Sequence, residues 1–161
     1  PEIGPRALGH RSLLVRPDSV ECRRRVSEKM KMREWYRPVA PIMLSHVAIQ
    51  YLADYKKGSA LAKYMLGVWK VKNEFADAFR GAVHIDGSVR AQVIDSEDEE
   101  LRHLFLLLNI LYREYDICGL INTSFNRKGA PIVSSWSQAM EQAAEMGVNL
   151  IWTDHEYKNQ V

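Results

Sequence analysis

The chain has 161 residues, which is enough for one domain with a buried core of its own. Its apolar fraction of 47% and charged fraction of 26% are those of an ordinary globular protein, and the formal net charge of +2 is too small to indicate general binding of nucleic acids. The apolar runs are much shorter than the roughly 18 residues that span a bilayer, so we expect no membrane segment.

The basic residues are unevenly distributed along the chain. Residues 1–40 hold ten Lys and Arg against five Asp and Glu, whereas the remainder is acidic on balance. A local excess of this kind favours a small anionic ligand over a long polyanion. Cys22 and Cys118 lack the spacing of metal ligands and predict two free thiols in a reducing, cytoplasmic environment. The chain begins at Pro1, inside a motif, which predicts a piece of a longer protein.

Hydrophobic periodicity and turn residues predict the elements of the first half of the chain. Asp18 is expected to cap the first helix. The expected elements, in order, are a turn-rich loop over residues 1–11, a strand over 12–15, a helix through Val20, Val26 and Met30, an extended segment over 36–41, a strand over 42–44, a short helix within 45–55 and a strand over 64–69.

The second half of the chain predicts two long helices and further strands. Asp86-Gly87 separates two apolar runs, as in a hairpin or tight turn. The expected elements are strands over 83–85 and 89–94, a helix over 97–115, a doubly buried strand over 117–121, a helix over 135–146 that Gly147 ends, and a strand over 149–153. Strands interleaved with helices predict an α/β fold with a mixed sheet.

Two arginine-rich segments stand out in the first forty residues. Residues 4–12 (GPRALGHRS) combine glycines, which let a ligand approach the backbone, with two arginines that match phosphate or carboxylate. Residues 31–38 (KMREWYRP) place three cations beside Trp35 and Tyr36, either of which could stack on a base. The structural alternatives are a surface turn with solvated arginines and the polar end of a helix with buried aromatics.

Two later segments carry clustered polar side chains. Residues 84–92 (HIDGSVRAQ) would display His84, Asp86, Ser88 and Arg90 on one face of an extended stretch, and the alternative is a solvated hairpin at the Asp-Gly turn. Residues 121–126 (INTSFN) bring four amide or hydroxyl side chains to the C-terminal end of a strand, where open α/β sheets bind ligands.

The residue types in these segments limit the chemistry. The sequence contains no P-loop, no Gly-x-Gly-x-x-Gly fingerprint, no hydrolytic triad and no zinc-site spacing. The candidates are cations, amides and hydroxyls, with few bases among them. Such a set suits a reaction among phosphates and carboxylates, in which positioning and charge neutralisation do most of the catalysis.

In order, the four segments resemble the C-terminal domain of the O-carbamoyltransferases, which include the nodulation, tobramycin and cephamycin carbamoyltransferases. The matching motifs are GPRALGHRS, K-x-R-E-x-[Y/F]-R-P-x-A-P, H-x-D-G-[S/T]-x-R-x-Q, and NTSFN followed by PIV, from residue 1 to about residue 152. The chain departs from the family pattern at Val39, where an aromatic residue is usual.

The resemblance implies that residues 1–161 are one domain, whose fold is similar to that of the threonylcarbamoyl-AMP synthases (the YrdC-like fold), with a mixed twisted sheet and flanking helices. It implies that this domain forms carbamoyl-adenylate from carbamoyl phosphate and ATP, with Mg²⁺ on the triphosphate. An N-terminal actin- and sugar-kinase-like domain of the same protein, with a metal of its own, would transfer the carbamoyl group to an acceptor hydroxyl, for example on a nodulation factor. No metal ligands are expected in this chain.

The matching motif positions give the expected site residues. Lys31, Arg37 and Arg90 are expected to be catalytic, with Lys31 and Arg37 on phosphates and Arg90 on phosphate or carbamoyl oxygens. The expected nucleotide- and carbamoyl-binding residues are Arg6, Arg33, Asn122, Thr123, Ser124 and Asn126.

Two alternative functions remain. The domain could bind a nucleotide or RNA without catalysis and dock the transfer domain. It could also be a self-standing threonylcarbamoyl-AMP synthase, which is disfavoured because the N-terminal lysine–arginine signature of that family is missing from the sequence.

Overall fold

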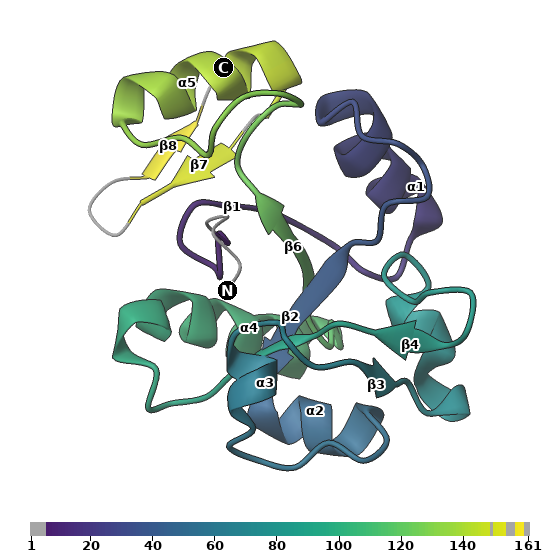
Figure 1. The fold of residues 1–161 in the computed structure, drawn as a ribbon. Coiled ribbons are helices and arrows are strands. Elements are labelled where there is room, and N and C mark those ends of the chain that lie inside the picture. The colour runs from purple at the N-terminus through teal and green to yellow at the C-terminus, as the bar shows by residue number, and fades with distance from the viewer. Residues whose placement is uncertain (1–5, 149, 154–156, 160–161) are drawn as a thin grey trace.

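The computed structural model describes residues 6–148, 150–153 and 157–159, and its centre is a four-stranded mixed sheet with the strand order β1-β6-β2-β5 (Figure 1). β1 (Ser12–Val15) and β2 (Ala40–Leu44) both pair antiparallel with β6 (Leu120–Ser124), and β2 pairs in parallel with β5 (Gln92–Ile94). All five residues of β2 are buried, as expected for an inner strand that is covered on both faces. The predicted α/β fold with a mixed sheet is confirmed.

Helices and two small ribbons surround the sheet. Figure 1 shows α1 and α5 above the sheet and α2 and α3 below it. The remaining elements are α1 (Val20–Arg24), the π-helix η1 (Arg25–Met30), α2 (Ser45–Tyr51), α3 (Ala60–Lys63), the 3₁₀-helices η2 (Asn73–Phe79) and η3 (Glu99–Leu101), α4 (Arg102–Tyr115), α5 (Trp136–Met146), a ribbon of β3 (Trp69–Lys70) with β4 (Ser88–Val89), and a ribbon of β7 (Leu150–Trp152) with β8 (Tyr157–Asn159).

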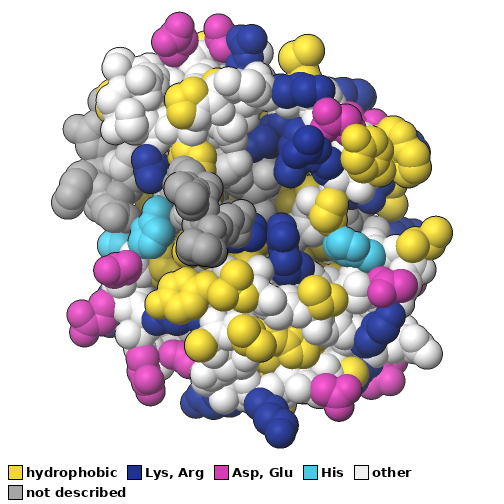
Figure 2. Space-filling view, in the orientation of Figure 1, with side chains coloured by type: hydrophobic (Ala, Val, Ile, Leu, Met, Phe, Trp, Pro, Cys, Tyr) yellow, Lys and Arg dark blue, Asp and Glu magenta, His cyan; other side chains and the backbone are white. Residues whose placement is uncertain are grey.

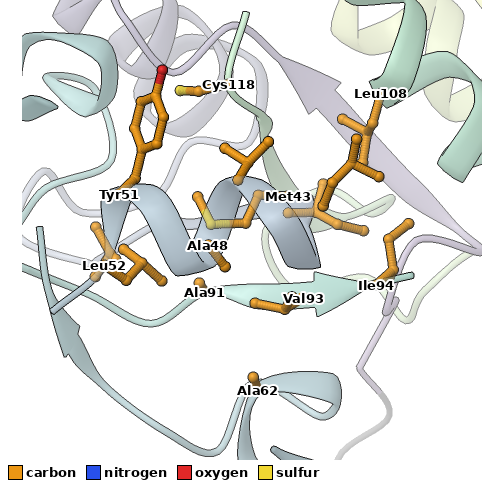
Figure 3. Packing of buried hydrophobic residues seen from close by; sticks show 14 of the residues in the cluster. Met43, Ala48, Tyr51, Leu52, Ala62, Ala91, Val93, Ile94, Leu108 and Cys118 are labelled. Atoms are coloured by element: carbon orange, nitrogen blue, oxygen red, sulfur yellow. The ribbon is translucent and has the colours of Figure 1, made fainter. Parts of the chain in front are cut away.

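Two large hydrophobic cores lie on different sides of this framework, and a small third cluster consists of Val39, Ala82 and Ile121. The larger core packs α2 and α4 against β2 and β5, and Figure 3 shows Met43, Ala48, Val93 and Leu108 meeting within it. The smaller core joins β1 and η1 to α5 and β7, and its buried residues are Leu13, Val26, Phe125, Val133, Ala139, Ala143, Met146 and Ile151. Leu120 near the start of β6 belongs to the larger core and Phe125 just after β6 to the smaller one, so β6 connects the two.

Several sequence predictions are confirmed. The strand over residues 12–15 is β1, and the long amphipathic helix is α4 with the turn of η3 before it. The helix over 135–146 is α5, for which Ser135 is the N-cap and Gly147 adopts the left-handed conformation that ends the helix. The Asp-Gly segment forms a tight turn in which the Asp86 carboxylate accepts hydrogen bonds from Ser88. The strand expected over residues 83–85 is wrong: only the His84 N–H donates across the turn, to the Ser88 carbonyl at 2.8 Å, and β4 forms its ribbon with β3 instead.

Four further local predictions are wrong. Ser19, not Asp18, caps the first helix, because its hydroxyl accepts a hydrogen bond from the Cys22 N–H at 3.2 Å. Residues 64–68 form no strand, because Met65 takes a left-handed conformation (φ 56°) and the Leu66 and Gly67 N–H groups turn back to the Leu61 carbonyl.

The other two errors concern where strands begin. Tyr36 and Arg37 lie in a turn, and β2 starts only at Ala40. The buried strand expected over 117–121 is β6, which is shifted to Leu120–Ser124. The shift places Asn122, Thr123 and Ser124 in the strand itself, as its last three residues.

The structure also bears on the predictions about the two cysteines and about membrane segments. Cys22 and Cys118 are free thiols, as predicted, and burial raises the pKa of Cys118 to about 12. Over the described ranges, the helices are too short and too polar for any of them to cross a membrane.

Candidate functional site

A cavity of about 160 Å³ lies at the C-terminal end of β6. It is lined by Arg6, Ala7, Leu8, Arg33, Pro38, Val39, Ala40, Met65, Arg90, Asn122, Thr123 and Ser124. These residues come from five separate parts of the chain, which the sheet and the loops around it bring together. Six of the nine predicted site residues are among them: Arg6, Arg33, Arg90, Asn122, Thr123 and Ser124.

The cavity wall is cationic. Arg6, Arg33 and Arg90 line it, and no Asp or Glu is among its lining residues in the described part of the chain. Burial lowers the pKa of Arg33, and the nearby positive charges of Arg37 and Arg90 lower it further. The positive charges of Arg33 and Arg90 repel each other, so an anion in the cavity would relieve the repulsion. On the face shown in Figure 2, Lys and Arg side chains gather around the middle and upper right, and most Asp and Glu side chains lie near the edge.

Lys31 lies behind this wall and is only 3% exposed. Lys31 directly follows the π-helix η1, and its backbone N–H donates to the Val26 carbonyl at 3.1 Å in the last turn of that helix. Its ammonium donates to the Ser124 carbonyl, to Ser124 Oγ at 3.0 Å and to Asn126 Oδ1 at 2.9 Å. These bonds use all three N–H groups of the ammonium. In this conformation Lys31 therefore organises the end of β6 instead of facing the cavity.

Asn126 extends this network into the following loop. Ser124 Oγ donates to Asn126 Oδ1 at 2.6 Å, and Asn126 Nδ2 donates to the carbonyls of Arg127 and Ala130 at 3.1 and 2.7 Å. The Asn126 side chain thereby holds residues 126–130 in a turn. The predicted residues Lys31 and Asn126 support the cavity from outside, because neither lines it.

Arg37 lies near Arg33 but does not line the cavity. The Arg37 N–H donates to the Glu34 carbonyl at 3.0 Å and closes a turn whose two central residues are Trp35 and Tyr36. Arg33 before this turn and Pro38 after it both line the cavity, so the turn projects from the rim. Trp35 is 73% exposed and Tyr36 is 66% exposed, and Arg37 pairs with Glu34 at 2.7 Å. The alternative interpretation of residues 31–38, in which the segment ends a helix and its aromatic residues are buried, is therefore wrong.

Sequence reasoning missed Gln92, a buried residue at the start of β5. Gln92 Nε2 donates to the Leu8 carbonyl at 2.8 Å, and Gln92 Oε1 accepts from Asn122 Nδ2 at 2.6 Å. This side chain joins the N-terminal loop to β6 just beneath the cavity. Its signal was present in the sequence as the last residue of the HIDGSVRAQ motif, where a Gln interrupts the apolar run of a buried strand.

Met65 is a second lining residue that sequence reasoning missed. It is buried and lines the cavity from the turn between α3 and β3, in the left-handed conformation that contradicted the predicted strand. A non-glycine residue in this conformation is uncommon and tends to occur at functional sites. No local pattern in the sequence marks it.

Over the described ranges, no group of three or more His, Cys, Asp or Glu side chains could hold a metal ion. The cavity itself offers guanidinium groups, which bind anions, together with amide and hydroxyl groups.

Comparison with known proteins agrees with the motifs. A model of the carbamoyltransferase C-terminus matches residues 1–159. Similar proteins include the nodulation protein NolO of Bradyrhizobium diazoefficiens, with 32% identity over 86% of this chain and 25% of the relative, and a 3'-hydroxymethylcephem-O-carbamoyltransferase of Amycolatopsis lactamdurans, with 31% identity over 92% of this chain and 27% of the relative. An uncharacterised protein of Methanocaldococcus jannaschii, MJ1051, is 30% identical over 86% of this chain and 26% of its own length.

The chain spans about a quarter of the length of these curated relatives. The family match, in contrast, extends over nearly every residue of the chain. The chain therefore belongs to the carbamoyltransferase C-terminal family and is a domain of that enzyme family.

Proposed function

We propose that this domain binds carbamoyl phosphate and ATP and forms carbamoyl-adenylate, an activated carbamoyl group. The observation that carries the proposal is the cavity at the end of β6, which brings three arginines together with the amide and hydroxyl groups of Asn122, Thr123 and Ser124. Both substrates are anions, and guanidinium groups bind phosphate oxygens through paired hydrogen bonds.

The size of the cavity suggests how the two substrates share it. Ligand pockets for larger molecules are commonly about 300–1,000 Å³, and this cavity measures about 160 Å³. A small anion such as carbamoyl phosphate suits this volume, whereas a whole nucleotide does not. We therefore place the reacting groups inside the cavity and the nucleoside at its rim, where Trp35 and Tyr36 are exposed.

The chemistry needs charge neutralisation more than acid–base catalysis. Water first cleaves carbamoyl phosphate to carbamate and inorganic phosphate. A carbamate oxygen then attacks the α-phosphorus of ATP, the bond from that phosphorus to the bridging oxygen breaks, and pyrophosphate leaves. Arg6, Arg33 and Arg90 would hold the two anions together and stabilise the charge that develops between them. Mg²⁺ bound to the triphosphate would supply further neutralisation.

The other predicted residues have supporting roles in this proposal. Lys31 would keep Ser124 in place while its positive charge stabilises anions nearby, and Asn126 would fix the loop behind it. Arg37 is exposed at the rim turn and would reach the phosphates of ATP once its pairing with Glu34 is exchanged for the ligand.

We also propose that the fold is related to that of the threonylcarbamoyl-AMP synthases. The mixed sheet with flanking helices supports this relation. Transfer of the carbamoyl group to an acceptor hydroxyl would belong to the remainder of a longer protein, since this chain covers only 24–27% of the relatives named as carbamoyltransferases.

Adenylation can be tested with the full-length protein that carries this domain. The protein is incubated with ATP, Mg²⁺ and carbamoyl phosphate, and carbamoyl-AMP and pyrophosphate are measured. Both products should form in equal amounts and only when carbamoyl phosphate is present. If the protein binds ATP without forming either product, the non-catalytic binding module replaces the adenylation proposal.

A further inference from the structure

The side chain of Glu34 joins two loops at the rim of the cavity. Its Oε2 atom pairs with Arg37 Nε at 2.7 Å, and its Oε1 atom accepts a hydrogen bond from Lys128 Nζ at 2.9 Å. The turn around Trp35 and Tyr36 is closed by a different group, the Glu34 backbone carbonyl, which accepts from the Arg37 N–H at 3.0 Å. The carboxylate is therefore not needed to form the turn on which it lies.

The two cations that meet at this carboxylate come from distant parts of the sequence. Arg37 and Lys128 bind different oxygens of the same group, so they lie close enough to bind a single anionic group together. In the described part of the chain, neither of them pairs with another carboxylate. If Glu34 moved away, two cations without a counter-charge would remain side by side, and they would attract an anion into the space between them.

The loop that carries Lys128 is anchored by bonds of its own. Asn126 Nδ2 donates to the Ala130 carbonyl at 2.7 Å, and the Arg127 N–H donates to Gln142 Oε1 on α5 at 3.0 Å. None of these bonds involves the carboxylate at the rim. Lys128 would therefore keep its place when that carboxylate leaves it.

The pair of cations is also close to the cavity wall. Arg33, which directly precedes Glu34 in the chain, lines the cavity. Burial lowers the pKa of Arg33 most, the positive charge of Arg37 lowers it further, and the negative charge of Glu34 raises it. The charges at the rim thus act on a residue of the wall, and an extended anion held by Arg33 can also reach Arg37.

The pairs that Glu34 makes can be exchanged for a ligand, because they are exposed. The exposed fractions of the Arg37 and Lys128 side chains are 54% and 56%, and exposed ion pairs contribute little to stability. A triphosphate offers several negative charges and many acceptor oxygens, against the single charge of a carboxylate. The hydrogen bond from Lys128, followed by one from the backbone, lowers the pKa of Glu34 to about 2. Its carboxylate therefore stays charged at neutral pH, and a competing anion is needed to release the cations.

We propose that Arg37 and Lys128 form an anion-binding site at the rim, that Glu34 occupies this rim site as an intramolecular anion in the ligand-free protein, and that the triphosphate of ATP displaces it. The inference rests on the proposed function, because it takes ATP as the ligand whose phosphates reach the rim. It goes further in assigning phosphate binding to Lys128 and an inhibitory role to Glu34. The carboxylate reduces the apparent affinity for phosphates, because only molecules with a free rim site can bind them there.

Tripolyphosphate tests the competition in the absence of a base and of a reaction. Its dissociation constant for the full-length protein is measured by calorimetry with the wild type and with Glu34→Gln, which retains the size of the side chain and loses its charge. We expect Glu34→Gln to bind tripolyphosphate about 2- to 30-fold more tightly, the range for two exposed ion pairs that no longer have to be broken. Equal or weaker binding by Glu34→Gln would overturn the inference, since the carboxylate would then support the rim and not compete for it.

The matched control for this charge change lies on α5. Glu145→Gln removes the same negative charge from another exposed ion pair of the same loop, the one with Arg127. It should leave the dissociation constant of tripolyphosphate nearly unchanged. If Glu145→Gln tightened binding as much as Glu34→Gln, the effect would come from net charge alone and the rim site would be refuted.

A second substitution tests the role of Lys128. When it is added to Glu34→Gln, Lys128→Gln should remove most of the gain in affinity, because one of the two freed cations is lost. Arg127→Gln, added to Glu34→Gln in the same way, changes the neighbouring cation of the loop and should retain the gain. A full gain in the variant that lacks Lys128 would refute its assignment to the site.

The outcomes distinguish this inference from the proposed function. If the full-length protein forms carbamoyl-AMP but Glu34→Gln binds tripolyphosphate no more tightly than the wild type, the proposed function stands and the inference fails. If the variants of Glu34 and Lys128 behave as expected but no carbamoyl-AMP is formed, the rim site stands and adenylation fails.

Discussion

Two opposing effects act on the pKa of Lys31. Burial, followed by the positive charge of Arg33, lowers the pKa of the Lys31 ammonium to about 7. The acceptors on Ser124 and Asn126 act in the opposite direction, because they bind the charged form. An ammonium with this pKa is partly charged at neutral pH, so its charge is sensitive to any anion bound nearby.

The lowered pKa of Lys31 predicts a pH-dependent stability. An unfolded Lys keeps its proton up to about pH 10.5, whereas folded Lys31 loses it from about pH 7. Between these values the unfolded state binds more protons, so the free energy of unfolding should rise with pH, by at most about 1.4 kcal/mol per pH unit. Lys31→Met should lose this slope. Urea denaturation of both proteins from pH 6 to 10 measures it, and parallel curves for the two would contradict the shift.

Arg33 offers a test of the cationic wall. Arg33→Ala removes one of the three guanidinium groups that line the cavity and a contact to Thr123 Oγ1 at 3.4 Å. We expect about 10- to 150-fold weaker binding of phosphonoacetamide, a stable analogue of carbamoyl phosphate, since a hydrogen bond to a charged group contributes about 1.5–3 kcal/mol. Arg16→Ala is the control, because Arg16 pairs with Asp18 away from the cavity. Calorimetry would contradict the assignment if the two variants bound equally well.

Among the elements, the turn from Glu34 to Arg37 carries two exposed aromatic residues between Arg33 and Pro38, which both line the cavity. If the nucleoside lies at the rim, Trp35→Ala should weaken ATP binding by about 5- to 100-fold, because stacking of a base on an aromatic ring contributes about 1–3 kcal/mol. Tripolyphosphate, which has no base, should bind the variant as it binds the wild type. Trp136→Ala on α5 should change neither affinity. A loss of tripolyphosphate binding in Trp35→Ala would mean that the turn positions cations and not the base.

β6 packs so closely against β2 that there is no room for a side chain at Gly119, the residue before β6. A Cβ atom at Gly119 would lie 2.5 Å from the Ile42 carbonyl oxygen and 3.2 Å from Met43 Cβ. Gly119→Ala should therefore push β6 away from β2 and lower the free energy of unfolding by about 1–3 kcal/mol, as overpacking does in cores. Gly58→Ala meets no atom within 4 Å and has only its positive φ to strain it. Denaturant unfolding would contradict the close packing if Gly119→Ala were as stable as the wild type.

The elements that the sequence predicted well are those with a strong local signal. α4 and α5 have amphipathic periodicity, and β1 is bounded by a turn-rich loop and a proline. The site segments were recognised because their polar residues do not fit the surrounding periodicity. The pairing of β6 with both β1 and β2, which decides that Asn122 to Ser124 lie in the sheet, depends on contacts distant in sequence. The π-helix that turns Lys31 inward and the left-handed Met65 have no local signal of comparable strength.

At the scale of the whole molecule, the cavity lies where the two cores meet along β6. Asn122, Thr123 and Ser124 lie between Leu120 in the larger core and Phe125 in the smaller core. The other residues that line the cavity also come from elements of both cores. Arg33 follows the π-helix that packs into the smaller core, and Arg90 lies between β4 and β5 of the larger one. A ligand in the cavity therefore contacts elements that are stabilised by different sets of hydrophobic contacts.

This position predicts that a bound ligand stabilises both cores together. At a phosphonoacetamide concentration 100 times its dissociation constant, mass action should add about 2.7 kcal/mol to the free energy of unfolding. Amide hydrogen exchange should slow by a similar factor in α5, which belongs to the smaller core, and in α4, which belongs to the larger one. Arg33→Ala should need correspondingly more ligand for the same protection. Slower exchange in α4 alone would show that the bound ligand stabilises only the larger core and that the cavity does not couple the stabilities of the two cores.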